Sequence, residues 1–256
     1  MVLTRALPVR KEEYPPDRLM DEIHPQNGAL TVRIGFYKVG RLQYISHLDL
    51  QRSMKRAMLR SGLPVWFSEG FNPHPKMVFA TPLSIGIESV CEFADIRMTA
   101  PVTPRAVIDG LNACMPEELQ LWYAAPPVRK MTDVVWASYE IVLEHPAASP
   151  ETAKAMDALY ANPLILTKRS KAGDKGTDIT PFIRSAHTEY GEDGKLHLSC
   201  LLCADNQNFL NPEYLIRGAS RDLGLSFDDP RTAYYTILRT YYLRVLRWQR
   251  EIPNVR

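Results

Sequence analysis

The feature that most limits the possible folds is the order in which strand-like and helix-like hydrophobic patterns follow one another. The run LTVRIGFYKVG, which starts at Leu30, alternates apolar with polar or small residues and predicts a half-buried strand. Helical spacing follows over 46–61, then two strands, a helix from Pro104 to about Cys114, and a closing strand, LQLWYAAPP. Strand, helix, strand, strand, helix, strand is the order of a ferredoxin-like split βαβ unit.

The secondary structure predicted between these two helices is less regular. LPVWFS reads as a short strand directly after the first helix, and a proline-rich loop follows it. KMVFATPLSIGIE and SVCEFADIRMTA are predicted as strands separated by a turn near Glu88 and Ser89.

The same kinds of pattern restart near Arg129. VVWASYEIVLEH alternates as a strand, 150–160 is helical, and LILTKRS and KLHLSCLLC are further strands. Asn211 is expected to cap a helix that has Pro212 at its first position and ends near Gly224. The final run TAYYTILRTYYLRVLRW could be a strand or an aromatic helix, and its β-branched and aromatic residues favour a strand.

We therefore predict an α+β fold of two tandem ferredoxin-like (βαββαβ) halves after a flexible N-terminal arm. The arm covers 1–29, which contains four prolines and scattered charge without periodicity. The first domain covers 30–128 and the second covers 129–256.

Composition restricts the possible function classes. A net charge of only +2 over 256 residues provides no bulk attraction to nucleic acid, so any such binding must come from local clusters. No apolar run approaches the roughly 20 residues of a membrane span, and no signal peptide is recognisable, so we expect a cytoplasmic protein. The motifs GxxxxGK[ST], GxGxxG and GxSxG are absent from the sequence.

The four cysteines are too few for a disulfide scaffold in a chain of this length. Cys200 and Cys203 form a CxxC, but residues three apart on a strand face opposite ways. We therefore expect buried thiols there and no metal site in this chain.

The stretch 40–82 contains most of the candidate functional residues. Its first half is predicted to be a helix with one apolar and one cationic face. Ser46 and Asp49 have the spacing of an N-cap and its reciprocal acid, and Gly62 follows the helix as a C-cap residue. The cationic face has four members, Arg52, Lys55, Arg56 and Arg60. They are either a solvated helix face or contacts for the phosphates of a nucleic acid. A second basic patch supports the phosphate interpretation: Lys168, Arg169, Lys171 and Lys175.

The second half of that stretch is the loop GFNPHPK. Pro73 and Pro75 each fix their own φ and restrict the preceding residue, so His74 lies on a rigid, extended segment. His47, Asp49 and His74 are candidates for an acid/base or metal constellation. The alternative is that Asp49 only caps the helix and that His47 is an ordinary residue of its first turn.

Three aromatic residues lie near these cations. Phe71, Tyr44 and Trp66 could stack on bases, or they could pack in the core or against loops, which we favour for Trp66.

Together these motifs resemble an uncharacterised bacterial family, the radical SAM-linked or radical SAM-associated proteins. The resemblance rests on the run RLQYISHLDLQRSMKRAMLRSGLPVWFSEGFNPHPKMVFATPLSIGIES, with further matches in DITPFIRS, NPEYLIRGASRDLGL and the pair Arg231 and Thr232. In that family the domain occurs alone or fused behind a radical S-adenosylmethionine domain.

The resemblance implies a partner protein that carries an iron–sulfur cluster and S-adenosylmethionine. This chain has no CxxxCxxC, so we expect it to hold no such cofactor itself. The positions that match the family motif form a site of unknown role: Ser46, His47, Asp49, Phe71, Asn72, Pro73, His74 and Pro75.

Three functions remain open at this point. The leading hypothesis is an RNA-binding accessory protein that presents a tRNA or rRNA substrate to a separate radical S-adenosylmethionine enzyme. The second is a hydrolase or nuclease that uses His47, Asp49 and His74, so whether the chain is an enzyme is undecided. The third is a protein–protein adaptor.

By fold analogy alone, tandem ferredoxin-like halves are similar to those of CRISPR repeat-processing endonucleases and pseudouridine synthases.

Overall fold

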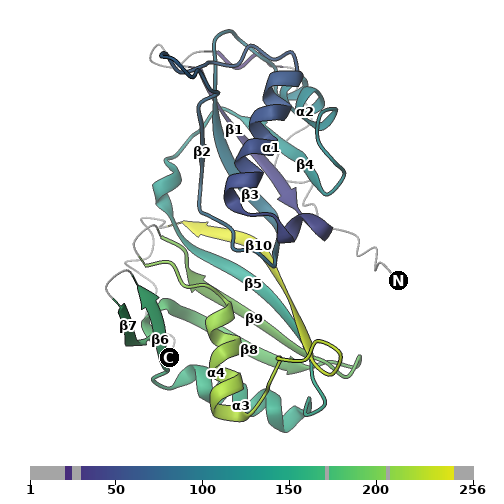
Figure 1. Cartoon of the computed structure of the whole chain (residues 1–256), viewed down its shortest axis with the longest axis vertical. Coiled ribbons are helices and arrows are strands. Elements are labelled where there is room, and N and C mark those ends of the chain that lie inside the picture. The colour runs from purple at the N-terminus through teal and green to yellow at the C-terminus, as the bar shows by residue number, and fades with distance from the viewer. Residues whose placement is uncertain (1–20, 25–29, 171–172, 206–207, 245–256) are drawn as a thin grey trace. The chain divides into compact units, whose positions relative to one another are not determined.

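A computed structural model describes residues 21–24, 30–170, 173–205 and 208–244 (Figure 1). It has a mixed α+β fold and divides into two compact units, Met1–Met131 and Thr132–Arg256, called unit 1 and unit 2 below. The predicted domains 30–128 and 129–256 stay predictions, because compactness alone does not test whether each part folds independently.

Unit 1 consists of a sheet and two helices, with short 3₁₀ helices between some elements. In chain order these are β1 (Leu30–Lys38), a 3₁₀ helix (Gly40–Tyr44), α1 (His47–Arg60), β2 (Met77–Phe79), β3 (Ile87–Met98), α2 (Pro104–Asn112) and β4 (Leu119–Ala125). β1 lies between β4 and β3, β2 pairs with β3, and each of these pairings is antiparallel. β3 therefore separates β1 from β2, the two strands that α1 connects.

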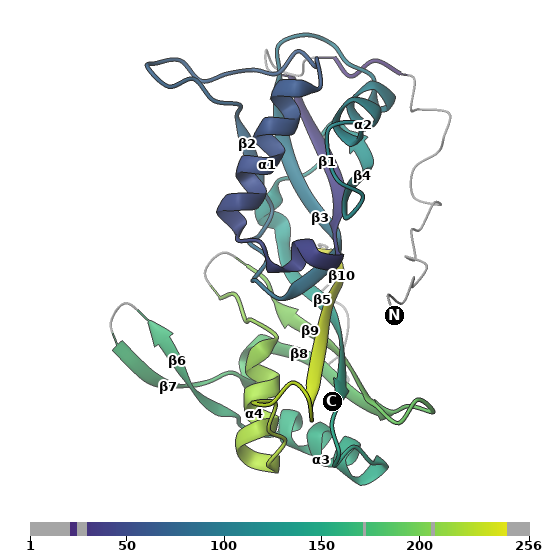
Figure 2. The ribbon, with the colours of Figure 1, turned by 45° about the vertical axis from the view of Figure 1, so that its right-hand side comes forward.

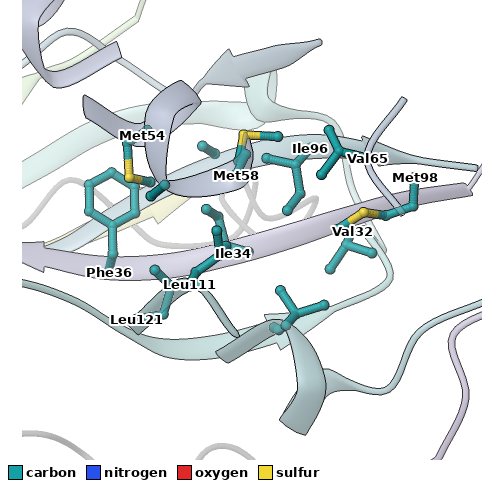
Figure 3. Packing of buried hydrophobic residues seen from close by; sticks show 14 of the residues in the cluster. Val32, Ile34, Phe36, Met54, Met58, Val65, Ile96, Met98, Leu111 and Leu121 are labelled. Atoms are coloured by element: carbon teal, nitrogen blue, oxygen red, sulfur yellow. The ribbon is translucent and has the colours of Figure 1, made fainter. Parts of the chain in front are cut away.

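Both helices of unit 1 pack on one face of its sheet. Alternate residues of β1 point to this face, and Figure 3 shows them against α1. The members labelled there are Val32, Ile34, Phe36, Met54, Met58, Val65, Ile96, Met98, Leu111 and Leu121. Each fully buried side chain of this size stabilises the fold by roughly 1.5–3 kcal/mol. The cores of α1 and β1 thus follow the periods seen in the sequence.

The opposite face of the unit 1 sheet is packed closely around Gly35. The Arg33 guanidinium donates to both Asp95 carboxylate oxygens, at 2.7 and 2.8 Å. Phe93 and Trp122 meet edge to face with ring centroids 5.6 Å apart. A Cβ on Gly35 would lie 2.9 Å from a ring carbon of Trp122, so only glycine fits beneath these rings.

Unit 2 repeats the alternation of strands and helices. A 3₁₀ helix (Met131–Asp133) leads into β5 (Val134–Glu144), α3 (Pro150–Ala161), β6 (Ile165–Ser170), β7 (Gly173–Asp178), a 3₁₀ helix (Thr180–Phe182), β8 (Ile183–Tyr190), β9 (Leu196–Cys203), α4 (Glu213–Leu223) and β10 (Tyr234–Arg244). The antiparallel sheet has the order β10-β5-β9-β8. β6 and β7 form a separate two-stranded hairpin between α3 and β8.

The prediction was wrong between α1 and β3. Only isolated bridges at Val65 and Phe67 stand where LPVWFS was expected to be a strand. β2 has three residues, because Pro82 has no N–H to extend the ladder, and the turn lies at Gly86, whose φ is +85°, so Glu88 and Ser89 are already in β3.

Other predictions were confirmed or needed small changes. Thr103 caps α2 by accepting the Ala106 N–H, with Pro104 at the first position as expected. At α4 the cap position is Pro212, one residue later than predicted, and the Asn211 side chain accepts the Glu213 N–H. The last described element, β10, is a strand.

Two further observations concern the termini and the membrane. Most of the predicted arm lies outside the described residues, but Ile23 is buried in the unit 1 core and its N–H donates to Val102 O at 2.7 Å. None of the helices in the described part of the chain has the length and apolarity needed to cross a membrane.

Candidate functional site

The amino end of α1 is organised by the predicted cap. Ser46 Oγ accepts the Asp49 N–H at 3.1 Å, and the same hydroxyl donates to the Asp49 carboxylate at 2.7 Å. Asp49 also accepts from Arg52 at 3.0 Å. The Ser46 hydrogen bond, and after it the Arg52 guanidinium, lower the pKa of Asp49, so this carboxylate is charged and committed to the cap.

The cationic face of α1 lies toward solvent. Arg52, Arg56 and Arg60 are exposed and Lys55 is half-buried, while the opposite stripe of α1 packs in the core. Arg52 pairs with Asp49 and Arg60 donates to Cys114 O at 3.0 Å. Among the described residues no carboxylate lies within ion-pair distance of Lys55 or Arg56. Within the described structure, neither of these two cations is therefore neutralised by an ion pair.

Residues 66–76, here called the finger, leave the sheet edge and return to it. Trp66 N donates to Arg97 O at 2.9 Å, and Arg97 N donates to Lys76 O at 3.2 Å, so both ends of the finger are anchored on β3. Lys76 N also donates to Trp66 O at 3.4 Å, which closes the base. In Figure 2 the segment between α1 and β2 projects away from the helices and sheet of unit 1.

Ser68 and His74 lock the finger internally. Ser68 N donates to His74 O at 3.0 Å, and His74 N donates to Ser68 Oγ at 3.1 Å. His74 Nδ1 lies 3.1 Å from Asn72 O and 3.1 Å from Ser68 Oγ, so the ring also contacts the finger. Gly70 has a φ of +118°, a value that glycine tolerates best. The predicted rigidity of the loop thus has a structural cause beyond the prolines.

The finger carries aromatic residues at its tip and base. Phe71 is fully exposed, although it is a large apolar side chain. At the base, Lys76 and Arg97 lie 6.0 and 5.7 Å from the ring centre of Trp66. Trp66 is half-buried, so it is neither the core residue we favoured nor a free platform.

His47 occupies a different environment from that of Asp49 and His74. Its ring meets Phe79 edge to face at 5.0 Å, and Gln51 Nε2 lies 2.9 Å from His47 Nε2. An amide nitrogen can only donate, so Nε2 accepts and the ring is neutral. Burial lowers the pKa of His47; the Glu92 carboxylate opposes that shift, and the Lys38 ammonium adds to it.

Lys38 and Glu92 are the functional candidates that the sequence analysis missed. They are 1% and 2% exposed, and Lys38 Nζ donates to Gln43 O at 3.2 Å. A signal for both was present: Lys38 continues the alternation of Ile34 and Phe36, and Glu92 that of Ala94 and Ile96. Charged residues at core-facing strand positions cost free energy unless they have partners, which marks them for attention.

In the described structure, the hydrogen bonds of the three predicted catalytic residues go to other groups, not to one another. His47 is bonded to Gln51, Asp49 to Ser46 and Arg52, and His74 to the finger. Nor do any three His, Cys, Asp or Glu residues in the described ranges form a group that could hold a metal ion. Catalysis by His47, Asp49 and His74 remains an untested hypothesis, and Asn72, Pro73 and Pro75 serve the shape of the finger.

The second predicted basic patch lies on the β6–β7 hairpin. Lys168 and Arg169 belong to β6, Lys175 belongs to β7, and Lys171 lies outside the described residues. Lys168 and Lys175 are direct partners in the ladder. This hairpin follows α3 as the finger follows α1, so the patch corresponds in position to the finger and not to the cationic helix.

The sequence matches one family model over residues 31–212, which is described as an uncharacterized protein conserved in bacteria (DUF2344). The chain belongs to this family. The DUF2344 match includes α1, the finger and the β6–β7 hairpin. No curated protein matches the chain.

Solved structures show only distant likeness to this DUF2344 chain. A chain in the crystal structure of a Cbf5–Nop10–Gar1 complex aligns with a TM-score of 0.48 and 11% identity, over 82% of this chain and 48% of that one. This chain therefore spans about half of that neighbour's length. A glycine cleavage system transcriptional repressor aligns with a TM-score of 0.21 and 9% identity, over 82% and 97% of the two chains. At these TM-scores neither likeness bears on function.

Proposed function

We propose that this protein is an RNA-binding accessory protein that presents a tRNA or rRNA substrate to a separate enzyme. The observation that carries the proposal is the exposed cationic face of α1, in which Lys55 and Arg56 have no carboxylate partner in the described part of the chain. Each cation that neutralises a phosphate releases a counterion, which drives binding at low salt.

The distribution of charge supports a local RNA site. The net charge of the whole chain is +2, whereas α1 alone contains Asp49 and four cations, which sum to +3. Such a concentration on one helix directs a polyanion to one place on the surface.

The strand order also supports the proposal. In unit 1 the first strand, β1, lies between the third and fourth strands, β3 and β4, as expected for a ferredoxin-like βαββαβ unit. In unit 2 the first strand, β5, lies between β9 and β10, which would be the third and fourth strands if the β6–β7 hairpin is an insertion. On this interpretation the chain has two tandem ferredoxin-like halves. Fold alone does not assign a function, so the argument for RNA rests on the cations.

The identity of the partner enzyme is proposed from the sequence resemblance alone. It is a radical S-adenosylmethionine enzyme that would supply the iron–sulfur cluster and S-adenosylmethionine. Purification of the tagged chain from a bacterial lysate, with and without ribonuclease, tests this part. Co-purification of an iron–sulfur protein supports it. Recovery of the chain with other proteins, none of which contains an iron–sulfur cluster, contradicts it.

The RNA part is tested by fluorescence anisotropy with a labelled single-stranded RNA over a series of KCl concentrations. The variant Lys55→Gln with Arg56→Gln should reduce the slope of log K against log salt by about 1.4, the value for two contacts to a single strand. The matched control is Lys154→Gln, a cation on α3 of unit 2. An affinity that does not change with salt, or equal effects of both variants, would show the proposal to be wrong.

A second candidate function is a hydrolase or nuclease with His47 as its base. It is favoured by the neutral, half-buried imidazole near Glu92 and Lys38. In that case His47→Gln should abolish turnover of a labelled RNA while the thermal midpoint stays within about 2 °C of wild type, the scale of a small surface change. Unchanged turnover in the variant would exclude His47 as the catalytic base.

A further inference from the structure

The finger is braced by several hydrogen bonds and exposes a large aromatic ring at its tip, which is more than a connection between α1 and β2 requires. Its base is held on β3 by two backbone hydrogen bonds, and Pro75 is buried beneath it and bridges to Phe67. Its inner turn is closed by Ser68 and His74. A loop that is fixed in this way loses little conformational entropy when it binds a ligand.

The finger held by these hydrogen bonds carries Phe71 at its tip. A fully exposed phenylalanine gains nothing from folding, because its ring stays in water. Its chain neighbours Glu69, Gly70 and Asn72 are also exposed, so the tip of the finger is polar next to this ring; the other exposed apolar residues of the finger are Phe67 and Pro73. A single ring on a polar tip is suited to contact with one flat apolar partner rather than with a broad protein interface.

The charges near the finger select among possible partners. Lys76 and Arg97 lie at its base beside Trp66, and Glu69 is the carboxylate on the finger itself. The cationic face of α1 precedes the finger in the chain. Aromatic rings next to cations are the combination that binds single-stranded nucleic acid, since the ring stacks on a base and the cations contact phosphates.

We infer that the finger stacks Phe71 on an unpaired base of the RNA, with His74 as a positioning residue that holds the finger in shape. The inference rests on the proposed function and narrows its substrate to RNA with a single-stranded segment or loop. Bases inside a duplex are already stacked on both faces and offer no surface to the ring. The contact requires no particular base, because every base has a π-face.

The experiment compares two labelled RNAs, a 12-nucleotide single strand and a blunt 12-base-pair duplex, by anisotropy at fixed KCl. Phe71→Ala should lower affinity for the single strand about 5- to 150-fold, the range for loss of one base–aromatic stack, and leave duplex binding unchanged. The slope against salt should not change, since no phosphate contact is lost. Ile85→Ala, which removes an exposed apolar side chain elsewhere in unit 1, is the matched control and should have no effect.

His74→Ala tests the positioning role. His74→Ala should lower the affinity of the otherwise wild-type protein for the single strand. In protein that already carries Phe71→Ala it should have little further effect, because His74 acts by positioning the Phe71 ring and that ring is then absent. Additive effects of the two changes would overturn the role of His74.

The outcomes separate this inference from the proposed function. Equal binding of the single strand by wild type and Phe71→Ala would overturn the stacking inference and leave the cationic RNA site standing. If neither RNA binds to the wild-type protein at low salt, the proposed function fails and the inference with it. If Phe71→Ala removes a bound protein from a ribonuclease-treated preparation and leaves RNA affinity unchanged, the finger serves protein recognition and the inference is overturned.

Discussion

Units 1 and 2 each have a helix directly after their first strand, α1 and α3, and these two helices differ in charge. α1 carries Asp49 against four cations, whereas α3 carries Glu151, Asp157 and the single cation Lys154. The sums are +3 for α1 and −1 for α3. Both helices bury an apolar stripe, so packing accounts for the stripe in each case but not for the cations of α1.

The polar residues of α3 bond within unit 2. Asp157 accepts the Thr188 N–H at 2.7 Å and a hydrogen bond with His187 at 2.9 Å, which ties α3 to β8. Lys55 and Arg56 on α1 have no such carboxylate partner in the described structure. A helix at this position therefore folds without a cationic face, as α3 does. The cationic face of α1 is thus a better candidate for ligand recognition than the polar face of α3.

The units also differ in the segment that follows the first helix. Unit 1 has the finger, which is braced by side chains and ends in an exposed aromatic ring, and unit 2 has the β6–β7 hairpin, which is paired by its backbone. Lys168 and Lys175 are partners in the backbone ladder of that hairpin.

The largest expected effect concerns two buried cations, Arg239 of unit 2 and Lys38 of unit 1. Arg239 on β10 is fully buried and donates to the Tyr139 hydroxyl at 3.1 and 2.9 Å, while the acceptor resolved for Lys38 in unit 1 is the Gln43 backbone carbonyl. The Tyr139 hydroxyl can be deleted by a side-chain change, whereas the Gln43 backbone carbonyl cannot. Tyr139→Phe should lower the free energy of unfolding by about 1.5–3 kcal/mol, the value for a hydrogen bond to a charged group.

Urea unfolding measures this loss, and Tyr160→Phe is its control. Tyr160 is also buried but donates to the Leu215 carbonyl, a neutral hydrogen bond worth about 0.5–1.5 kcal/mol. Equal losses for the two variants would mean that the charge of Arg239 adds nothing to the contact.

The second-largest expected effect tests whether the β6–β7 hairpin of unit 2 also contacts RNA. Lys168→Gln with Lys175→Gln should weaken single-stranded RNA binding about tenfold near 0.1 M salt, through loss of two phosphate contacts. Unchanged affinity would restrict RNA binding to unit 1 and sharpen the contrast between the units.

The smallest effect is an opposite pH dependence of two histidines. Burial lowers the pKa of His47, so the unfolded chain takes up the proton first, and this residue's contribution to stability is lost as pH falls below about 6.5. Hydrogen bonding and charge from Asp157 raise the pKa of His187, so its contribution is present below about pH 6.5 and lost as pH rises through the folded-state pKa. His187 is exposed, so its effect is the weaker one.

Urea unfolding from pH 5 to pH 8 checks both signs. His47→Gln should make the decline in stability toward pH 5 shallower, and His187→Gln should make it steeper. Slopes that change in the same direction would contradict these assignments.

The parts of the fold that follow from periodicity were predictable from sequence. The core faces of β1 and α1, the Ser46 cap and the start of α2 at Pro104 were all confirmed, because each depends on neighbours within a few residues. The segment 63–86 was not, because its path depends on which backbone groups of β3 remain free to pair, and pairing partners distant in sequence leave no local signal.

The candidate site was only partly predictable. The cationic face of α1 follows from helical spacing and the rigidity of the finger from Pro73 and Pro75. Lys38 and Glu92 could not be predicted from charge alone, because most charged residues are exposed, and these two occupy core positions of strands. His47 and His74 were grouped by closeness in sequence, but a 14-residue helix separates the segments that hold them, about 21 Å along its axis.

The most direct test of the central claim is ultraviolet crosslinking of the protein to a 12-nucleotide RNA, followed by mass spectrometry of the crosslinked peptides. The account predicts crosslinks on the peptides that span α1 and the finger, with loss of the finger crosslink in Phe71→Ala. Crosslinks confined to unit 2, with none between residues 47 and 76, would contradict it.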